Sequence, residues 1–280
     1  MWELLRRNPK FISGAVVLGV IVMFGVIGPM FTRDPTYRRL PISQPPNNDF
    51  ILGTTGLGQD VFAQLCTGIR NSLIVGLLSG GLGTLIAILF GALGAYKGGL
   101  TDEISNFITN IVMVFPVFQA LIILAYVLES RSLILVGLLI AATGWPWAAR
   151  CIRSQVLSLK EREFINLARM SGMRSIETAV KEVLPNMFAY ILMVFVLLTG
   201  GAIIAESGIS MLGLGPDPNN NVTLGSMLYN CMNYYSPYSR WTYLWWWYLP
   251  PGIVLTMLLS STFVMHAGMD EVFNPRLRRM

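Results

Sequence analysis

The sequence predicts an all-α membrane protein that crosses the lipid bilayer several times. Of its 280 residues, 54% are hydrophobic and only 12% are charged, and the mean hydropathy is +0.58. Soluble domains average about 25% charged residues. Six long segments contain no Asp, Glu, Lys or Arg, and a helix needs about 20 mainly apolar residues to cross a bilayer. Because lipid offers the backbone no hydrogen-bond partner, these segments should be helices. The expected spans are 11–31, 72–96, 104–128, 132–149, 186–205 and 245–265.

The first apolar segment follows Arg6, Arg7 and Lys10, as the core of a signal peptide would. Its apolar run is longer than the roughly 7–15 residues of a signal core, and no small-x-small cleavage site follows it. We therefore expect it to be a retained first span.

The basic residues set the expected orientation, because cytoplasmic loops of membrane proteins carry an excess of Lys and Arg. With the N-terminus inside, fourteen of the twenty basic residues fall on the cytoplasmic side. This predicts a cytoplasmic N-terminus and tail (1–10 and 266–280), outer loops at 32–71 and 206–244, and one long inner loop at 150–185. Aromatic residues near the start of the sixth span are expected at the outer interface: Trp241, Tyr243, Trp245, Trp246, Trp247 and Tyr248.

The second and third expected spans carry features that bear on packing and on a solute pathway. In the second, small residues lie four apart, as in Gly76 and Gly80, which lets helix backbones approach closely, so this span should be central. In the third, Pro116 removes a backbone hydrogen bond and should kink the helix. Pro116 and Gln119 are candidates for lining a pathway, and contacts between helices are the alternative.

The inner loop carries an unusual density of charge, with seven basic and four acidic residues between positions 149 and 185. Four of its side chains recur at the spacing of one helix face: Phe164, Leu167, Ala168 and Ser171. Gly172 follows where a helix would stop, and a second helical stretch should run from about Arg174 to the fifth span. A short amphipathic helix of this kind either lies on lipid headgroups or docks in a groove of a partner protein.

This loop resembles the coupling loop of ABC importer permease subunits, which is written EAA, three residues, G, nine residues, I-x-L-P. The residues that match are Ala168, Gly172, Leu184 and Pro185. Three positions depart from the pattern: Asn166 stands for the glutamate, Leu167 for an alanine and Glu182 for the isoleucine.

Four other stretches, in the same order and spacing over nearly the whole chain, resemble the C-type subunit of the dipeptide/oligopeptide/nickel permease family. They are RRNP at 6–9, LGTTGLGQDV at 52–61 with GIRNSL at 68–73, ESGISMLGLG at 206–215 and NPRLR at 274–278. The resemblance implies an ABC type I importer permease fold with six transmembrane helices and a cytoplasmic coupling helix. The transporter type-1 transmembrane domain would cover 72–280.

What the resemblance implies about function is half of a translocation pathway for short oligopeptides or oligosaccharides, working by alternating access. A nickel or other small-solute importer of the same family is the alternative. The implied partners are a homologous sister permease subunit, two cytoplasmic ABC ATPases and an extracellular or periplasmic solute-binding protein, in the cell membrane and without nucleic acid. ATP and Mg²⁺ would bind to the ATPases, so this chain would hold no cofactor and would not itself be an enzyme.

Two groups of site residues follow from the resemblance. Those expected to couple to an ATPase are Glu163, Phe164, Asn166, Leu167, Ala168, Arg169, Ser171, Gly172, Leu184 and Pro185. Those expected to face a binding protein or the pathway are Gly53, Thr54, Gly58, Asp60, Pro116, Gln119 and Glu206. In the outer stretch, Thr55 and Gln59 replace a usual aspartate and arginine. The loss of these two charges would favour a neutral oligosaccharide over a peptide with charged termini.

Two other classes of protein fit the sequence less well. A stand-alone secondary carrier normally places ionisable groups in the membrane, and the expected spans carry no buried ion pair or string of carboxylates. An enzyme is disfavoured because there is no HExxH, no GxSxG paired with a histidine and no P-loop. The three cysteines (Cys66, Cys151, Cys231) and the lone His266 have no metal-ligand spacing.

Overall fold

The protein is all-α, as the composition predicts. A computed structural model describes residues 5–128, 131–234 and 244–273. Within these ranges there is no strand, only an isolated bridge between Thr54 and Asp60. The helices are α2 (Pro9–Phe31), α3 (Val61–Ala87), the π-helical η1 (Ile88–Leu93), α4 (Gly94–Lys97), α5 (Gly99–Val114), α6 (Val117–Leu128), α7 (Leu133–Gly144), α8 (Pro146–Lys160), α9 (Glu163–Met170), α10 (Ser175–Thr178), the π-helical η2 (Ala179–Val183), α11 (Leu184–Asn186), α12 (Phe188–Met211), α13 (Leu224–Tyr234) and α14 (Trp245–Phe273).

Helices long and apolar enough to cross a membrane account for most of the chain. Four qualify singly: Pro9–Phe31, Val61–Lys97, Phe188–Met211 and Trp245–Phe273. Two bent pairs, α5 with α6 and α7 with α8, bring the number among the described residues to six if each pair is one span. This agrees with the six expected spans, while the lipid boundaries at 11–31, 72–96 and the rest stay predictions.

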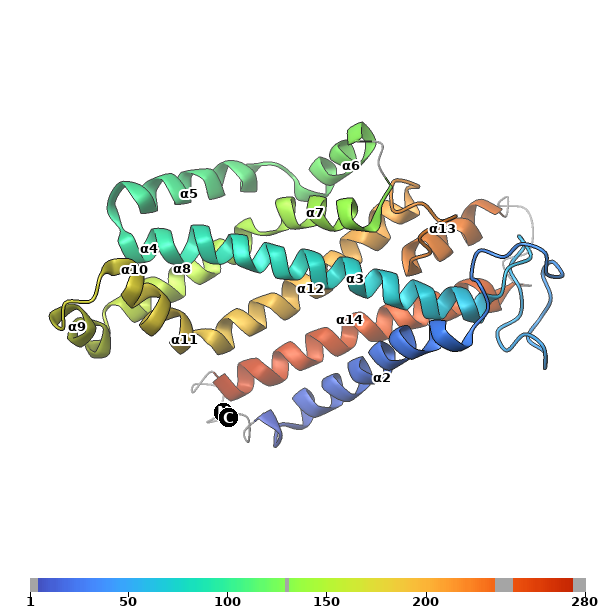
Figure 1. The fold of residues 1–280 in the computed structure, drawn as a ribbon, viewed down its shortest axis with the longest axis horizontal. Coiled ribbons are helices and arrows are strands. Elements are labelled where there is room, and N and C mark those ends of the chain that lie inside the picture. Colours follow the sequence, from blue (N-terminus) through green and yellow to red (C-terminus); the bar gives the residue numbers. More distant parts are fainter. Residues whose placement is uncertain (1–4, 129–130, 235–243, 274–280) are drawn as a thin grey trace.

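The long helices lie side by side and give the molecule two distinct ends (Figure 1). One end holds α9 and α10, the start of α2 and the end of α14. The opposite end holds the segment 32–60 and α13. The inner-loop helix and the expected outer loops are therefore separated by the full length of the bundle.

The helix of the second span begins earlier than expected. Asp60 caps α3, because its side chain accepts hydrogen bonds from the backbone N–H groups of Phe62 (2.9 Å) and Ala63 (3.3 Å), as favourable N-caps do. The last part of the expected outer loop 32–71 is therefore helical, as the start of α3.

The third and fourth spans are both broken at a proline. The α5 and α6 axes differ by 80°, because Phe115 before Pro116 takes extended angles (φ −74°, ψ 131°) that prolines favour in the residue before them. The predicted kink at Pro116 is confirmed and is a full break. The α7 and α8 axes differ by 49° at Trp145, just before Pro146.

Other helices also extend beyond the expected spans. The loop expected at 150–185 starts as helix, because α8 continues to Lys160. In the expected outer loop 206–244, α12 extends to Met211 and α13 forms a further helix. The tail expected from 266 is helical to Phe273. A charge-free stretch marks only the part of a helix that is expected in lipid. Backbone hydrogen bonds continue each helix beyond that part.

The aromatic residues at the start of α14 differ in burial. Trp245 is exposed, but Trp246 and Trp247 are buried. Trp246 donates from Nε1 to the carbonyl of Thr54 (3.2 Å), and Trp247 packs on Tyr234. These two rings therefore fasten α14 to the segment 32–60 and to α13, and their place at the outer interface stays a prediction. Trp241 and Tyr243 lie outside the described residues.

The helix α3 is central, as its glycines predict. It packs against α2, α7, α8, α12, α13 and α14. A Cβ at Gly80 of α3 would lie 2.1 Å from Oγ1 of Thr199, and one at Gly91, in η1 directly after α3, would lie 2.4 Å from the carbonyl oxygen of Ala149. Small residues at these points let the α12 and α8 backbones approach.

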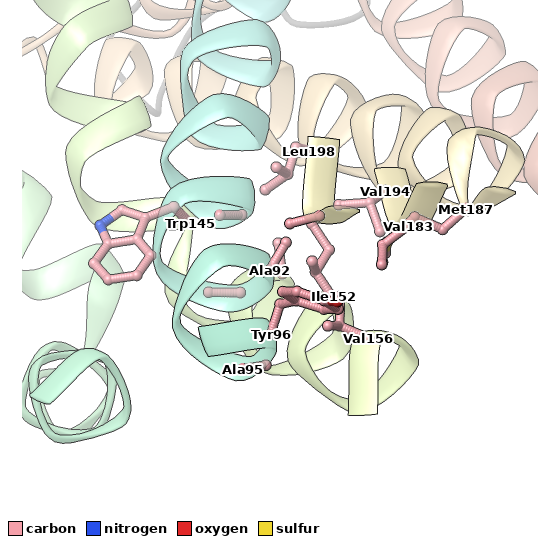
Figure 2. Packing of buried hydrophobic residues seen from close by; sticks show 14 of the residues in the cluster. Ala92, Ala95, Tyr96, Trp145, Ile152, Val156, Val183, Met187, Val194 and Leu198 are labelled. Carbon is pink, nitrogen blue, oxygen red and sulfur yellow. The ribbon is translucent and has the colours of Figure 1, made fainter. Parts of the chain in front are cut away.

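A buried cluster at the α9 end joins three parts of the chain (Figure 2). Ile152 and Val156 of α8 lie beside Tyr96 of α4, and Val183 and Met187 approach from the segment before α12. The base of the inner loop is therefore part of a packed core.

Candidate functional site

The helix expected to couple to an ATPase is α9 (Glu163–Met170), which projects at one end of the bundle (Figure 1). Ile165 is fully buried and belongs to the same cluster as Ile152 and Tyr96, and Phe164 packs partly against that cluster. Ala168 is also buried. One face of α9 is therefore fixed to its own chain.

The exposed face of α9 differs from the expected one. Leu167 is 61% exposed and Met170 is 76% exposed. With Glu163 and Asn166, also exposed, they recur at the spacing of one helix face. The face predicted from Phe164, Leu167, Ala168 and Ser171 is wrong in part, because the periodicity alone did not show that Ile165 and Ala168 turn inward. The side chain of Arg169 lies outside the described residues.

Gly172 ends α9 in the way that its position predicts. Its φ is +85°, a left-handed conformation that favours glycine. The N–H of Met173 donates to the carbonyl of Ala168 (3.3 Å), and the Ser171 hydroxyl donates to the same carbonyl (2.8 Å). These contacts close the last turn as in a Schellman motif.

The second helical stretch, predicted from about Arg174, is present as α10, η2 and α11. Leu184 packs partly against the buried cluster, whereas Pro185 is exposed. On the exposed side of this stretch, Lys181 donates to Glu177 (2.7 Å), and this hydrogen bond lowers the pKa of the Glu177 carboxyl.

The outer residues expected to face a binding protein instead build their own loop. Gly53 and Gly58 have φ of +69° and +67° and hold turns. Thr54 is buried, and its hydroxyl donates to the carbonyl of Pro41 (2.6 Å). Asp60 caps α3. None of these four presents a freely exposed side chain, so the expectation of an exposed recognition surface at these residues is corrected.

The two departures in this loop, Thr55 and Gln59, are also buried, at 0% and 2% exposure. The Thr55 hydroxyl accepts hydrogen bonds from the N–H groups of Leu57 (3.2 Å) and Gln59 (3.1 Å), and Gln59 accepts from Nε2 of Gln64 (2.9 Å). Thr55 and Gln59 stand where the family usually has charged residues, so the difference lies inside the loop and not on its surface. These positions therefore remove no charge from the surface, and they give no reason to favour an oligosaccharide over a peptide.

Glu206 is fully buried in α12 and does not reach the surface. Its carboxylate accepts hydrogen bonds from the hydroxyls of Ser210 (2.6 Å), Thr223 (2.7 Å) and Ser72 (3.2 Å). The Ser72 hydroxyl also accepts from the N–H of Leu224 (3.2 Å). The network joins α12, α3 and the start of α13, so Glu206 does not offer an exposed side chain to a binding protein, and its place in the pathway stays a prediction.

A cavity of about 610 Å³ lies between α3, α5, α6, α7, α8 and α12. Its lining includes Phe118, Trp147 and Gly201, and no charged side chain is among the lining residues. The hydroxyls of Ser79 and Thr143 donate to backbone carbonyls of Gly137 (2.8 Å) and Leu139 (3.0 Å), so the cavity wall is almost wholly apolar.

The residues singled out for a pathway lie next to this cavity without lining it. Pro116 and Gln119 are exposed, whereas their neighbours Met113, Val117 and Phe118 line the cavity. The contribution of α7 and α8 was missed, although the Trp145-Pro146-Trp147 sequence marks it. Among the described residues, no group of three or more His, Cys, Asp or Glu could hold a metal ion.

Comparisons with known proteins agree with this layout of helices. The family described as "Binding-protein-dependent transport system inner membrane component" matches residues 83–279. The oligopeptide transport system permease protein OppC of Bacillus subtilis is 30% identical over 98% of this chain and 88% of its own length. The dipeptide transport system permease protein DppC of Bacillus subtilis is 29% identical over 99% of this chain and 85% of its own length. OppC of Mycobacterium tuberculosis is 31% identical over 85% of this chain and 79% of its own length.

The family match covers well over half of the chain, and the similarity to B. subtilis OppC extends almost from end to end. Both agree with an all-α protein whose helices can cross the membrane several times. The chain therefore belongs to the family of binding-protein-dependent transport system inner membrane components and is a permease subunit of such a transporter.

Proposed function

We propose that this chain forms half of the translocation pathway of an ATP-driven importer for short peptides. The pathway would alternate between inward-facing and outward-facing states as partner ATPases bind and hydrolyse ATP. A homologous sister subunit would complete the pathway, and two cytoplasmic ATPases would bind ATP and Mg²⁺. A solute-binding protein would deliver the cargo.

The observation that carries this proposal is the exposed face of α9. Glu163, Asn166, Leu167 and Met170 form a short amphipathic surface on a helix whose other face is anchored by Ile165. A groove in a partner can hold such a face. Because the anchored side belongs to the packed core, displacement of a docked α9 would also displace the helices that it contacts.

The proposed orientation places α9 and both chain termini in the cytoplasm. The distribution of basic residues supports it, and α9 lies at the same end of the bundle as the start of α2 and the end of α14 (Figure 1). The segment 32–60 and α13 would then face the solute-binding protein.

Peptides are the proposed cargo for two reasons. The relatives named above are oligopeptide and dipeptide permease proteins. The cavity beside Pro116 has no charged lining residue. Its wall therefore neither attracts nor repels a side chain of the cargo by its charge. A wall of this kind suits cargo of varied sequence, with selection left to the solute-binding protein.

A reconstitution experiment tests the proposal. The chain is co-expressed with its sister subunit and both ATPases, placed in vesicles, and supplied with the binding protein and labelled peptides or oligosaccharides. We expect ATP-dependent peptide uptake. Uptake without ATPases would contradict the proposal, and uptake of oligosaccharides but not peptides would refute the cargo.

The docking face is tested by Leu167→Asp. An acidic residue at a contact that carries much of the binding energy should cost about 2 kcal/mol or more, so the purified complex should lose its ATPases. Ile51→Asp is the matched control, because Ile51 is 66% exposed but lies at the opposite end of the molecule. Equal ATPase recovery from the two variants would exclude Leu167 from the contact.

A further inference from the structure

The coupling helix α9 is joined closely to the helix that precedes it. The N–H of Arg162 donates to the carbonyl of Leu159 (3.0 Å), and the N–H of Ile165 donates to the carbonyl of Arg162 (3.1 Å). Hydrogen bonds thus run through the turn between α8 and α9. Ile165 also lies in one buried cluster with Ile152 and Val156 of α8, and η2, which belongs to this cluster, contacts both α9 and α8. A displacement of α9 therefore reaches α8 through the turn and through this cluster.

A bidentate ion pair fastens α8 to α5. Arg153 donates from Nε to Oδ1 of Asp102 (2.8 Å) and from Nη2 to Oδ2 (2.7 Å). The guanidinium fork matches a carboxylate in this geometry, which fixes orientation as well as distance. The two side chains are 31% and 18% exposed, so water screens them only in part.

Further polar contacts lie along the same side of α8. Arg150 donates to Oδ1 of Asn110 on α5 (2.8 Å). Lys160 donates to the carbonyl of Ala95 at the end of α4 (3.2 Å), and its ammonium lies 5.9 Å from the centre of the Tyr96 ring. The helices α8, α5 and α4 are therefore held together over most of the length of α8.

The other ion pairs among the described residues have different roles. Lys181 and Glu177 lie on one helical stretch, four residues apart. Lys10 and Glu271 join α2 to α14, neither of which leads to α9. Of these pairs, Asp102–Arg153 is the one that ties the helix before α9 to another span.

The helix α5 in turn reaches the cavity. It ends at Val114, and the 80° break at Phe115–Pro116 follows at once. Met113 on one side of the break and Val117 and Phe118 on the other line the cavity. A shift of α5 would therefore change the shape of the cavity wall.

The route forward along the chain from α9 contains two interruptions of the helix. It passes Gly172 and then a break between α11 and α12 at Met187, whose φ and ψ are −106° and 11°. The backward route, through α8 and the ion pair to α5, crosses only the hydrogen-bonded turn at Arg162.

We propose that Asp102 and Arg153 are positioning residues that make α5 and α8 one rigid body, so that movement of α9 reaches the break at Pro116 and the cavity. This inference rests on the proposed function, in which α9 is the part that an ATPase moves. Without the pair, α8 would move on its own and ATP would be hydrolysed with less transport.

The experiment replaces the ion pair by a removable covalent link. Asp102→Cys and Arg153→Cys are combined with Cys151→Ser, since Cys66 and Cys231 are buried. The reconstituted importer is assayed for peptide uptake per ATP hydrolysed, before and after bis-methanethiosulfonate cross-linkers of graded length and again after reduction. We expect uptake per ATP to fall by about 2- to 30-fold in the unlinked variant. It should recover when a linker of fitting length joins the two helices, and fall again on reduction.

A matched control uses the other interhelical ion pair. Lys10→Cys with Glu271→Cys, in the same background, should keep wild-type uptake per ATP with and without the linker. Asp102→Asn, which keeps the side-chain shape, should lower uptake per ATP without a change in ATPase recovery.

The outcomes distinguish a failure of the ion-pair proposal from a failure of the proposed importer function. If the wild-type complex shows no ATP-driven uptake, the proposed function fails and this inference falls with it. If the wild type transports, the inference alone fails when the unlinked variant keeps wild-type uptake per ATP, or when no linker restores it. If both the cysteine variant and Asp102→Asn fail to assemble, the pair serves folding rather than coupling, and the proposal is overturned.

Discussion

Gly172 is required for its backbone conformation and not for lack of space. Its φ is +85°, and no atom lies within 4 Å of the place that a Cβ would take. A left-handed conformation costs an L-residue about 1–2 kcal/mol, and a β-branched residue is the least suited to it. The end of α9 and its angle to α10 therefore depend on this one residue.

We expect Gly172→Val to lower transport per ATP, because the chain would leave the left-handed region and shift α9 in its docking groove. Gly172→Asn is the control, since asparagine tolerates this region better than other residues. Uptake and ATP hydrolysis of the reconstituted complex would be measured together. Wild-type coupling in the valine variant would show that the closing turn of α9 is dispensable.

Glu206 is expected to stabilise the fold, because it is buried and its carboxyl group is hydrogen-bonded. Three hydroxyls, of Ser72, Ser210 and Thr223, donate to its carboxylate. Leaving a buried polar group without its partner costs about 1–3 kcal/mol. Removal of the acceptor should therefore loosen the junction of α3, α12 and α13.

Glu206→Ala should lower the Tm of the purified protein in detergent, and Glu206→Gln should lower it less, because the amide oxygen can still accept. Glu103 is exposed, so Glu103→Ala serves as a surface control and should change stability by no more than about 0.5 kcal/mol. If Glu206→Ala matches Glu103→Ala, the network does not stabilise the fold.

Among the elements, the break between α5 and α6 follows from local backbone chemistry. Pro116 has no N–H to donate and disfavours the helical region at Phe115. The 80° bend there turns Val117 and Phe118 toward the cavity. The chain has a second proline break, at Pro146, where the proline occupies the first position of α8 and the missing N–H costs little.

We expect Pro116→Ala to loosen the angle between α5 and α6. Spin labels on Phe107→Cys and Tyr126→Cys, at exposed positions on the two helices, would report a broader and longer distance distribution by pulsed EPR. Pro146→Ala should leave that distribution unchanged. An unaltered distribution in Pro116→Ala would mean that packing alone sets the bend.

For the whole molecule, the two ends of the bundle have different roles in the proposed importer. One end carries α9, and the other carries the segment 32–60 and α13 (Figure 1). The proposed topology places these ends on opposite sides of the membrane. Exposed residues at each end, such as Asn48 and Arg174, can test it.

With Cys151 replaced by serine, a membrane-impermeant maleimide should label Asn48→Cys in intact cells. It should label Arg174→Cys only after the membrane is opened. The physical reason is the excess of basic residues on the α9 side, which favours its retention in the cytoplasm. Labelling in the reverse pattern would invert the topology and refute the docking of α9 to cytoplasmic ATPases.

Local chemistry is what the sequence by itself determined. Charge-free stretches predicted the long helices, Pro116 predicted a break, and Gly172 predicted the end of the coupling helix. Each of these follows from lipid solvation or from the backbone limits of one residue type, and needs no knowledge of distant contacts. The coupling-loop motif and the four other family motifs along the chain were enough to predict the family.

Contacts between residues far apart in the sequence were decided only by the tertiary structure. Periodicity showed that α9 is amphipathic, but packing against α10, η2 and the buried cluster determined that Ile165 turns inward and Leu167 outward. In the same way, the sequence suggested that Thr55 removes a charge from the surface, but Thr55 is buried. The pairing of Asp102 with Arg153 joins residues 51 positions apart. Burial and charge pairing depend on which helices become neighbours, and a pattern along one helix does not specify its neighbour.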